Sequence, residues 1–283
     1  MKHKRRIVMM GGGSVNWSPK LINDFILTKG LKEVEYIILD TDEKLGEQMA
    51  VLGNKLAKMR GSVCTFYHTA DQKSAFLYAD YVIITVSTGG LDAMAYDLEI
   101  PQEYGIYQTV GDTVGPGGWA RGLRNIPVFA ETAKNIQKYA PDAVVLNYTN
   151  PMAPLTKVFY EVSKLKTVGL CHGLFEVYSV LMKIFGLESE EQIKVRFGGI
   201  NHFFWITDLI INGEDGYALL KEKIGERTFA DLVQEKYSDG AGFHSNKQLC
   251  SELYSHYGYL PYVADRHISE FFSCYLVGRK KAG

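Results

Sequence analysis

The stretch RIVMMGGGSVN, residues 6–16, decides the fold class of this chain. Its first part, Arg6 to Met10, is a short and mostly apolar run, which predicts a buried β-strand. The glycines that follow, Gly11 to Gly13, and Ser14 predict a tight turn that leads into a helix running towards Thr28. A buried strand, a glycine turn and a helix in this order open a βαβ unit, the building block of parallel α/β sheets.

The same alternation of strands and helices continues along the chain. Further apolar runs predict strands at 34–39, 81–86, 143–147 and 167–170, and apolar spacing predicts a helix over 43–59. This pattern is typical of a Rossmann-type doubly wound parallel sheet. From about residue 195 the pattern changes, because 195–199 and 203–212 resemble paired strands. We therefore expect a Rossmann domain over 1–194 and the start of an α+β domain over 195–283.

Charge and composition exclude several classes of partner. The 283 residues carry 31 Lys and Arg against 32 Asp and Glu, so no basic surface for nucleic acid is expected. No apolar run approaches the ~20 residues that cross a bilayer, and the run after the basic start is too short for a signal peptide. The cysteines are scattered without a CxxC pair, which is typical of a reducing compartment. We expect a soluble, cytoplasmic protein.

The glycine turn also predicts a bound dinucleotide. Glycines such as Gly11 and Gly13 let the backbone approach a pyrophosphate, and Ser14 stands where the chain turns into a helix whose N-terminus attracts phosphate. Asn16 replaces the third glycine of the GxGxxG pattern, so the turn alone is a weak signal. Asp40 strengthens it, because an acid that closes the second strand accepts both ribose hydroxyls and repels a 2′-phosphate.

A second turn supports the same prediction. Thr88 and Gly89 lie in the stretch 85–90, which closes another predicted strand and gives the backbone a further place to pass a cofactor. The alternative is a plain tight turn with a solvated aspartate at Asp40. Because the features occur in the expected order, they favour a dinucleotide site, with NAD rather than NADP as the ligand.

Polar motifs follow the later strands, where an open α/β sheet binds its ligands. NYTNPM (147–152) and CHG (171–173) end two predicted strands, and Asn201 and His202 follow a third. These residues are expected to converge, because the carboxyl ends of the strands line one crevice. A thiolate, imidazoles and an amide can hold a divalent metal. The spacing alone leaves open that the cysteine and the histidines are ordinary core residues.

Taken together, the motifs resemble glycoside hydrolase family 4 over essentially the whole chain. The resemblance is carried by GGGS at 11–14, GPGG at 115–118, RGLRNIPV at 121–128, NYTNPM at 147–152, CHG at 171–173, GINHF at 199–203 and DRHISEF at 265–271. It implies bound NAD, a divalent cation that is usually manganese, and a cysteine that must stay reduced. Its NAD dependence sets the family apart from glycosidases that use two carboxylates.

The resemblance implies a mechanism of oxidation and elimination. NAD takes hydride from C3 of the sugar, a base removes the C2 proton, and the metal stabilises the enediolate. The aglycone then leaves C1, water adds and the hydride returns. In this mechanism Cys171 and His202 are the metal ligands, and His172 lies beside the reacting hydroxyls or the leaving group. Asn150 holds sugar hydroxyls near the nicotinamide, and Asn201 is a further contact to the substrate.

Two residues compete for the role of the base. Asp265 matches the aspartate of the family's non-phosphorylated α-glycoside group, and Tyr262 matches the tyrosine used elsewhere in the family. A carboxylate near a metal-acidified proton is a sufficient base, so Asp265 is the first candidate and Tyr262 its rival. The alternative for Asp265 is an ion pair with Arg266 that orders a loop.

Further details resemble the α-galacturonidase branch of the family. Met94 stands where the phosphoglycosidases carry an arginine for the sugar phosphate, and GIYQTVGDTVGPGG (105–118) is similar to the α-galacturonidases. A uronate carboxylate needs a cation or several donors, and guanidinium groups suit it. Arg121, Arg124 and Arg266 are therefore candidate substrate contacts. We expect an α-linked galacturonide as the substrate, with NAD and Mn²⁺ as cofactors.

Other functions stay open at this point. The chain could instead be an α-glucuronidase, an α-galactosidase or an α-glucosidase of the same family. A 2-hydroxyacid dehydrogenase would share the fold, but its catalytic histidine loop and its arginine on a mobile loop are not found at the expected places. The chain also ends soon after DRHISEF, whereas family members continue, so we expect a C-terminally truncated chain. An inactive NAD-binding fragment is thus a third alternative, and we expect a homo-oligomer for the full-length protein.

Overall fold

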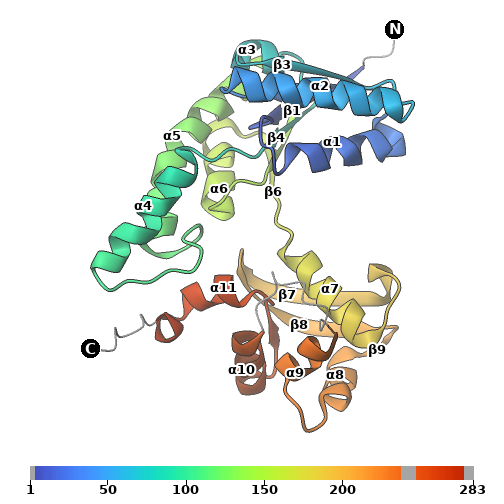
Figure 1. Ribbon diagram of the computed structural model, residues 1–283, viewed down its shortest axis with the longest axis vertical. Helices are drawn as coiled ribbons and strands as arrows, with labels where there is room; N and C mark the ends of the chain where they lie inside the picture. Colours follow the sequence, from blue (N-terminus) through green and yellow to red (C-terminus); the bar gives the residue numbers. More distant parts are fainter. Residues whose placement is uncertain (1–3, 237–246, 277–283) are drawn as a thin grey trace. The chain divides into compact units, whose positions relative to one another are not determined.

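The structure is a computed structural model that describes residues 4–236 and 247–276. The chain divides into two compact units (Figure 1). The first consists of residues up to 93 together with 120–170, and the second of residues 94–119 together with those from 171 on. The basic start at residues 1–3 and the end of the expected α+β domain lie outside the described residues.

The first unit is built on a parallel six-stranded sheet, which confirms the predicted fold class. Its strands are β1 (Arg5–Met10), β2 (Val34–Leu39), β3 (Thr65–Thr69), β4 (Tyr81–Ile84), β5 (Val144–Asn147) and β6 (Lys166–Gly169). They lie in the order β3-β2-β1-β4-β5-β6, and every neighbouring pair is parallel. The order reverses between β1 and β4, and at this switch point open α/β sheets bind their ligands.

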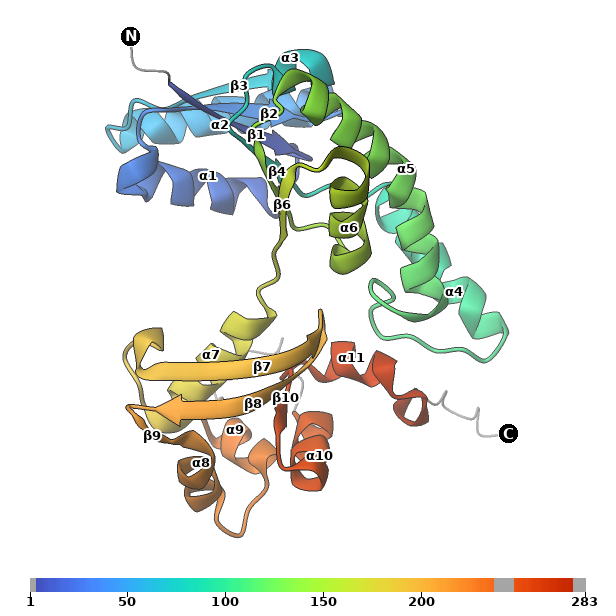
Figure 2. The ribbon, with the colours of Figure 1, turned by 180° about the vertical axis from the view of Figure 1, so that it is seen from behind.

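Helices cover both faces of this sheet, because alternate residues of a strand point to opposite sides. Val8 and Met10 of β1 belong to one apolar core with α3, α5 and α6, whereas Ile7 and Met9 belong to another with α1 and α2 (Figure 2). The helices are α1 (Ser18–Leu27), η1 (Lys29–Leu31), α2 (Glu43–Met59), α3 (Gln72–Phe76), α5 (Gly115–Tyr139) and α6 (Met152–Ser163). Of these, α5 begins in the second unit.

Two local features of the first unit differ from the sequence prediction. The helix after the glycine turn begins only at Ser18, and residues 11–17 form turns apart from position 14. The sequence pattern also misses β3, because its five residues TFYHT mix polar and apolar side chains. This strand lies at the edge of the sheet and buries Phe66, so a single face of it contributes to the core.

The second unit contains a sheet in which all described strand pairs are antiparallel. β7 (Ile193–Ile200) and β8 (Phe203–Ile211) form the strand pair that the sequence predicts, and β9 (Glu214–Asp215) and β10 (Leu260–Pro261) each pair with β8. The helices are α4 (Gly90–Glu103), which begins in the first unit, α7 (Gly173–Phe185), η2 (Glu190–Gln192), α8 (Gly216–Ile224), α9 (Phe229–Lys236), α10 (Gln248–Tyr257), α11 (Asp265–Ile268), η3 (Ser269–Phe271) and η4 (Ser273–Tyr275).

The contacts divide the chain after Leu170, whereas the sequence pattern suggests a boundary at 194. Helix α7 joins the second unit because Val177, Leu181 and other residues of its apolar face are buried in one core with β7 and β8. Residues 94–119 join it as well, because the loop at 109–113 is hydrogen-bonded to His202 and to residues 266–270. Within the described ranges, no helix combines the length and apolarity needed to cross a membrane.

Candidate functional site

The glycine turn after β1 is closely packed against the neighbouring strands. Gly11 has φ +82°, and a Cβ added there would lie 2.7 Å from the carbonyl oxygen of Thr85. A Cβ at Gly12 would lie 2.7 Å from the carbonyl oxygen of Met9. Any side chain at these two positions would therefore push the turn away from β1 and β4. Glycine is required here for the backbone path itself.

Asp40 lies at this turn, as its place after β2 suggests. Its Oδ2 accepts a hydrogen bond from the Gly13 N–H at 2.8 Å, and its Oδ1 accepts one from the Asp42 N–H at 2.9 Å. A Cβ at Gly13 would approach Oδ2 to 2.8 Å, so the third glycine is needed for this contact. The two backbone bonds fix the carboxylate of Asp40 beside the turn.

The N-terminus of α1 has the features of an anion-binding helix end. Its first turn holds no acidic residue, and no side chain caps it. The hydroxyl of Ser18 is buried at this end and has no hydrogen-bond partner among the described residues. The positive end of the helix dipole favours a phosphate at such a place, whereas the Ser18 N–H already donates to the carbonyl oxygen of Ser14 and Pro19 has no N–H. The residues of the turn thus fit a dinucleotide.

Helix α5 anchors the two loops that follow β4 and β5. The hydroxyl of Thr88 donates to Oδ1 of Asn125 at 2.7 Å, and Nε of Arg124 donates to the carbonyl oxygen of Thr88 at 2.9 Å. Nε of Arg121 donates to the carbonyl oxygen of Asn150 at 3.1 Å. The candidate residues Thr88, Asn150 and Arg121 therefore belong to one set of contacts in the first unit. These contacts give Arg121 and Arg124 a structural role in holding the loops.

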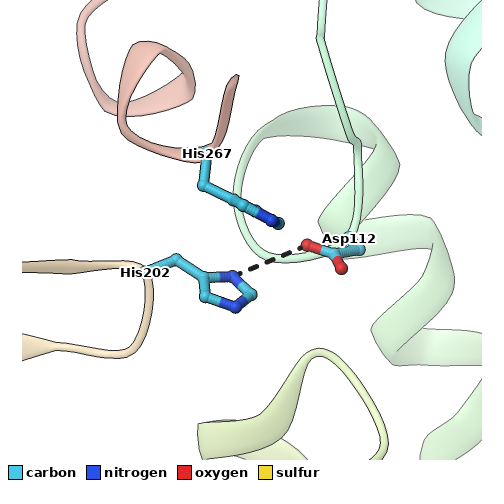
Figure 3. A group of neighbouring side chains, drawn as sticks. All are labelled: Asp112, His202 and His267. Carbon is cyan, nitrogen blue, oxygen red and sulfur yellow. Dashed lines mark ion pairs between the residues drawn. The ribbon is translucent and has the colours of Figure 1, made fainter. Parts of the chain in front are cut away.

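Three side chains of the second unit form a candidate cation site. Asp112, His202 and His267 each offer one ligand atom, and these atoms all lie within 4.8 Å of one another (Figure 3). Asp112 comes from the loop before α5, His202 from the two-residue connection between β7 and β8, and His267 from α11. His202 has φ +63°, the left-handed backbone conformation that tight connections between antiparallel strands use.

Cys171 lies against the same histidine. Its Sγ is 3.5 Å from Nε2 of His202, and the N–H of Gly173, at the start of α7, points to the sulfur at 3.4 Å. Two ligands bound ~2.0–2.3 Å from one ion are separated by ~3–3.7 Å, so the sulfur–nitrogen distance suits a shared cation. The structure thus brings together the two residues predicted as metal ligands.

The hydrogen bonds of Thr113 determine which nitrogen of His202 can bind a cation. The Thr113 hydroxyl donates to Oδ1 of Asp112 at 2.7 Å and lies 2.7 Å from Nδ1 of His202. Because the hydroxyl has only one proton, Nδ1 of His202 must be the donor in the second bond. Nε2, which faces Cys171, is then unprotonated. An imidazole oriented in this way is a typical metal ligand with an outer partner.

The protonation states also suit a cation. Burial, followed by the charge of His267, lowers the pKa of His202 to about 4. Burial also lowers the pKa of His267, and its Nδ1 is buried without a hydrogen-bond partner in the described parts of the chain. Burial raises the pKa of the Cys171 thiol, so binding a cation there would release a proton. Neutral imidazoles and an unsatisfied buried nitrogen fit a divalent ion better than they fit a closed core.

The two candidate bases have different surroundings. The ring of Tyr262 stacks on that of His202, with centroids 5.8 Å apart, and its hydroxyl donates to Oε2 of Glu176 at 3.3 Å. Burial and the charge of Glu176 raise the pKa of Tyr262. Lys247 donates to Oε1 of the same Glu176 at 3.0 Å, which completes a buried network. Tyr262 therefore lies beside the cation site.

Asp265, by contrast, contacts the start of α10. Its two carboxylate oxygens accept the N–H groups of Leu249 and Cys250 at 3.3 and 3.1 Å. Asp265 and Arg266 line a cavity of about 870 Å³ together with polar residues of α10 such as Ser251 and Glu252. A carboxylate at these N–H groups stabilises the end of the helix, which is a structural role.

The remaining candidate residues lie around the cation site. His172 is exposed at the N-cap of α7, and Nδ2 of Asn201 is buried without a hydrogen-bond partner among the described residues. Asp112, Thr113 and His267 are site residues that the sequence alone does not predict. A signal was available, because Asp112 and Thr113 fall in the GIYQTVGDTVGPGG stretch and His267 in DRHISEF. Nothing in the spacing indicates that these stretches meet.

Sequence profiles of one protein family match nearly the whole chain. The profile described as "Family 4 glycosyl hydrolase" matches residues 6–187, and that of the "Family 4 glycosyl hydrolase C-terminal domain" matches residues 197–281. Among curated proteins, an α-galacturonidase of Bacillus subtilis (strain 168) is 37% identical over 276 residues, which are 94% of this chain and 60% of that protein. The chain thus spans about three fifths of this relative.

Solved structures give the same picture. The structure of lplD from Bacillus subtilis superposes with a TM-score of 0.83 at 34% identity and covers 95% of this chain and 63% of that one. A 6-phospho-α-glucosidase from gut microorganisms, solved in complex with NAD and Mn²⁺, has a TM-score of 0.76 at 25% identity and covers 93% of this chain and 60% of that one. Both structural similarities include residues of both units.

Proposed function

Because the chain belongs to glycosyl hydrolase family 4, we propose that it cleaves an α-linked galacturonide with the help of NAD and a divalent cation, with Mn²⁺ as the first candidate. The observation that carries the proposal is the contact between Cys171 Sγ and His202 Nε2, with Asp112 and His267 around it. Two histidines and a carboxylate suit a divalent transition metal, and the thiol of Cys171 contacts one of these histidines. The relative solved with NAD and Mn²⁺ supports the choice of cofactors.

The chemistry that the two cofactors supply when bound is hydride acceptance at C3 of the sugar and Lewis acidity beside C2. On the protein side, Gly11, Gly13 and Ser14 would hold the pyrophosphate at the start of α1, and Asp40 the adenosine ribose. Thr88, Gly89 and Asn150 would border the same ligand. Cys171 and His202 would hold the cation, with Thr113 keeping Nε2 of His202 unprotonated.

For removal of the C2 proton we favour Tyr262 over Asp265. Tyr262 stacks on a proposed metal ligand, and a bound cation would lower the pKa that burial raises. Asp265 is engaged by the N–H groups of α10, which supports a structural role. Exposed His172 and Nδ2 of Asn201, which has no hydrogen-bond partner within the described ranges, are then available for the sugar and its leaving group.

The uronate preference rests on the relatives and on cationic residues. The α-galacturonidase of Bacillus subtilis supports a galacturonide over other sugars of the family. Arg266 is exposed and lines the cavity beside α10, so it is our first candidate for a carboxylate contact, ahead of Arg121.

None of the four cysteines, all of them in described parts of the chain, forms a disulfide. This fits a reducing cytoplasm, and we propose that the protein forms a homo-oligomer.

The experiment that tests this function is an assay of α-linked galacturonide hydrolysis by the 283-residue chain. Activity is expected only when NAD and Mn²⁺ are both present, and a chelator should abolish it. The galacturonide should be preferred over an α-galactoside 6-phosphate, because Met94 offers no charge to a phosphate. Equal activity without NAD would overturn the mechanism, and a preference for the phosphorylated sugar would overturn the choice of substrate.

A further inference from the structure

The loop that supplies Asp112 is held by a single carboxylate oxygen. The backbone N–H groups of Thr109, Val110 and Gly111 all donate to Oε1 of Glu270, at 2.9, 2.7 and 2.8 Å. Three consecutive N–H groups that converge on one point form a concave anion site of the nest type. Glu270 lies 159 to 161 positions further along the chain, so this contact exists only in the folded second unit.

The conformation of the loop depends on this arrangement. Gly111 has φ +64°, and a Cβ added there would lie 2.6 Å from Cδ2 of Leu98, so the turn that aims the three N–H groups requires glycine. Nη2 of Arg266 donates to the carbonyl oxygen of Thr109 at 2.8 Å, and the Thr109 hydroxyl donates to the carbonyl oxygen of Arg266. Both the backbone of the loop and the side chain of Thr109 are thus hydrogen-bonded to residues 266–270.

The same short segment also supplies a side chain of the cation site. His267 precedes Glu270 by three residues, across the boundary of α11 and η3, and therefore lies about one helical turn away. Asp112 and Thr113 directly follow the loop that Glu270 binds. Glu270 consequently connects the element that carries His267 to the element that carries Asp112 and Thr113. Thr113 in turn orients His202.

We propose that Glu270 is a positioning residue for the cation site, which it assembles by holding the loop 109–111 so that Asp112 and Thr113 meet His202. This inference rests on the metal site of the proposed function. Glu270 does not need to touch the cation, because its carboxylate is used by the backbone of the loop. Its effect passes through Asp112 and through Thr113, so the variants of Glu270 and Asp112 should be partly coupled.

The test is Mn²⁺ titration by calorimetry of the wild-type chain and of Glu270→Ala, Glu270→Gln, Asp112→Ala and the double variant with both alanines. We expect Glu270→Ala to weaken Mn²⁺ binding by ~10- to 100-fold, the range typical of outer partners of metal ligands. Glu270→Gln should recover part of the loss, because its amide oxygen can accept the same N–H groups. In the Asp112→Ala background, Glu270→Ala should weaken Mn²⁺ binding by a smaller factor than in the wild type, because only the part of the effect that passes through Thr113 remains.

Glu222→Ala is the matched control, because it removes an exposed carboxylate from α8 of the same unit and should leave Mn²⁺ binding unchanged. A melting curve of each metal-free variant checks the fold, and Glu270→Gln covers the case in which Glu270→Ala fails to fold. Wild-type affinity in both Glu270 variants, or a full additional loss in the double variant, would overturn the role of Glu270 alone. A wild-type chain that binds no Mn²⁺ would instead overturn the metal site, and the role of Glu270 with it.

Discussion

The sulfur of Cys171 lies 3.5 Å from Nε2 of His202, although 31 positions separate the two residues in the sequence. Cys171 directly precedes α7, and His202 lies in the connection between β7 and β8. Their approach follows from the packing of α7 on this sheet, where both share one apolar core. The candidate cation site is thus a product of the tertiary structure of the second unit.

Loss of either residue should weaken metal binding. Cys171→Ser and His202→Ala are each expected to reduce Mn²⁺ affinity by at least ~10-fold, since the loss of even an outer partner costs that much. Calorimetry with the metal-free chain measures the effect, and Cys274→Ser, which changes an exposed cysteine, is the matched control. Unchanged affinity in Cys171→Ser would show that the cation binds elsewhere.

Asp40 should determine the choice of cofactor. Asp40→Ala is expected to weaken NAD binding by about 10- to 100-fold, which corresponds to a lost hydrogen bond to a charged group. Asp40→Asn keeps an acceptor for the Gly13 N–H but removes the charge, so NADP should bind better relative to NAD than it does to the wild type. The exposed Asp142 provides a control variant, Asp142→Ala. Equal affinity of the wild-type chain for NAD and NADP would refute this role.

Tyr262 and Asp265 should respond differently to substitution. Asp265→Ala is expected to lower the free energy of unfolding by about 1 kcal/mol, because it removes the acceptor for two N–H groups of α10. Tyr262→Phe removes only the hydroxyl and should abolish proton exchange at C2 of the sugar while NAD and Mn²⁺ still bind. Loss of exchange in Asp265→Asn, with exchange kept in Tyr262→Phe, would restore Asp265 as the base.

The parallel sheet could be predicted because its signals are local. The strands β1, β2, β4 and β5 are compact, mostly apolar runs, and Gly11 to Ser14 mark the turn after β1 within a few residues. The strand β3 escapes prediction because three of its five side chains, two threonines and a histidine, are polar in this strand at the edge of the sheet. Asp40 could be placed at the glycine turn because parallel strands end at the same edge of the sheet.

The completion of the cation site could not be predicted in this way. Cys171 and His202 were identified from the family resemblance, whereas Asp112 and His267 join them through contacts between distant parts of the chain. The loop at 109–113 belongs to the second unit only because Glu270, Arg266 and His202 bind it. No periodicity in the sequence encodes such hydrogen bonds.

The measurement that tests the central claim most directly is deuterium incorporation at C2 of the sugar. The wild-type chain is incubated in D₂O with NAD, Mn²⁺ and an α-linked galacturonide, and the released galacturonate is analysed by NMR. Oxidation and elimination require the C2–H bond to break, so the product should carry solvent deuterium at C2. A glycosidase that uses two carboxylates leaves this bond intact. Hydrolysis with the C2 proton fully retained would contradict the account.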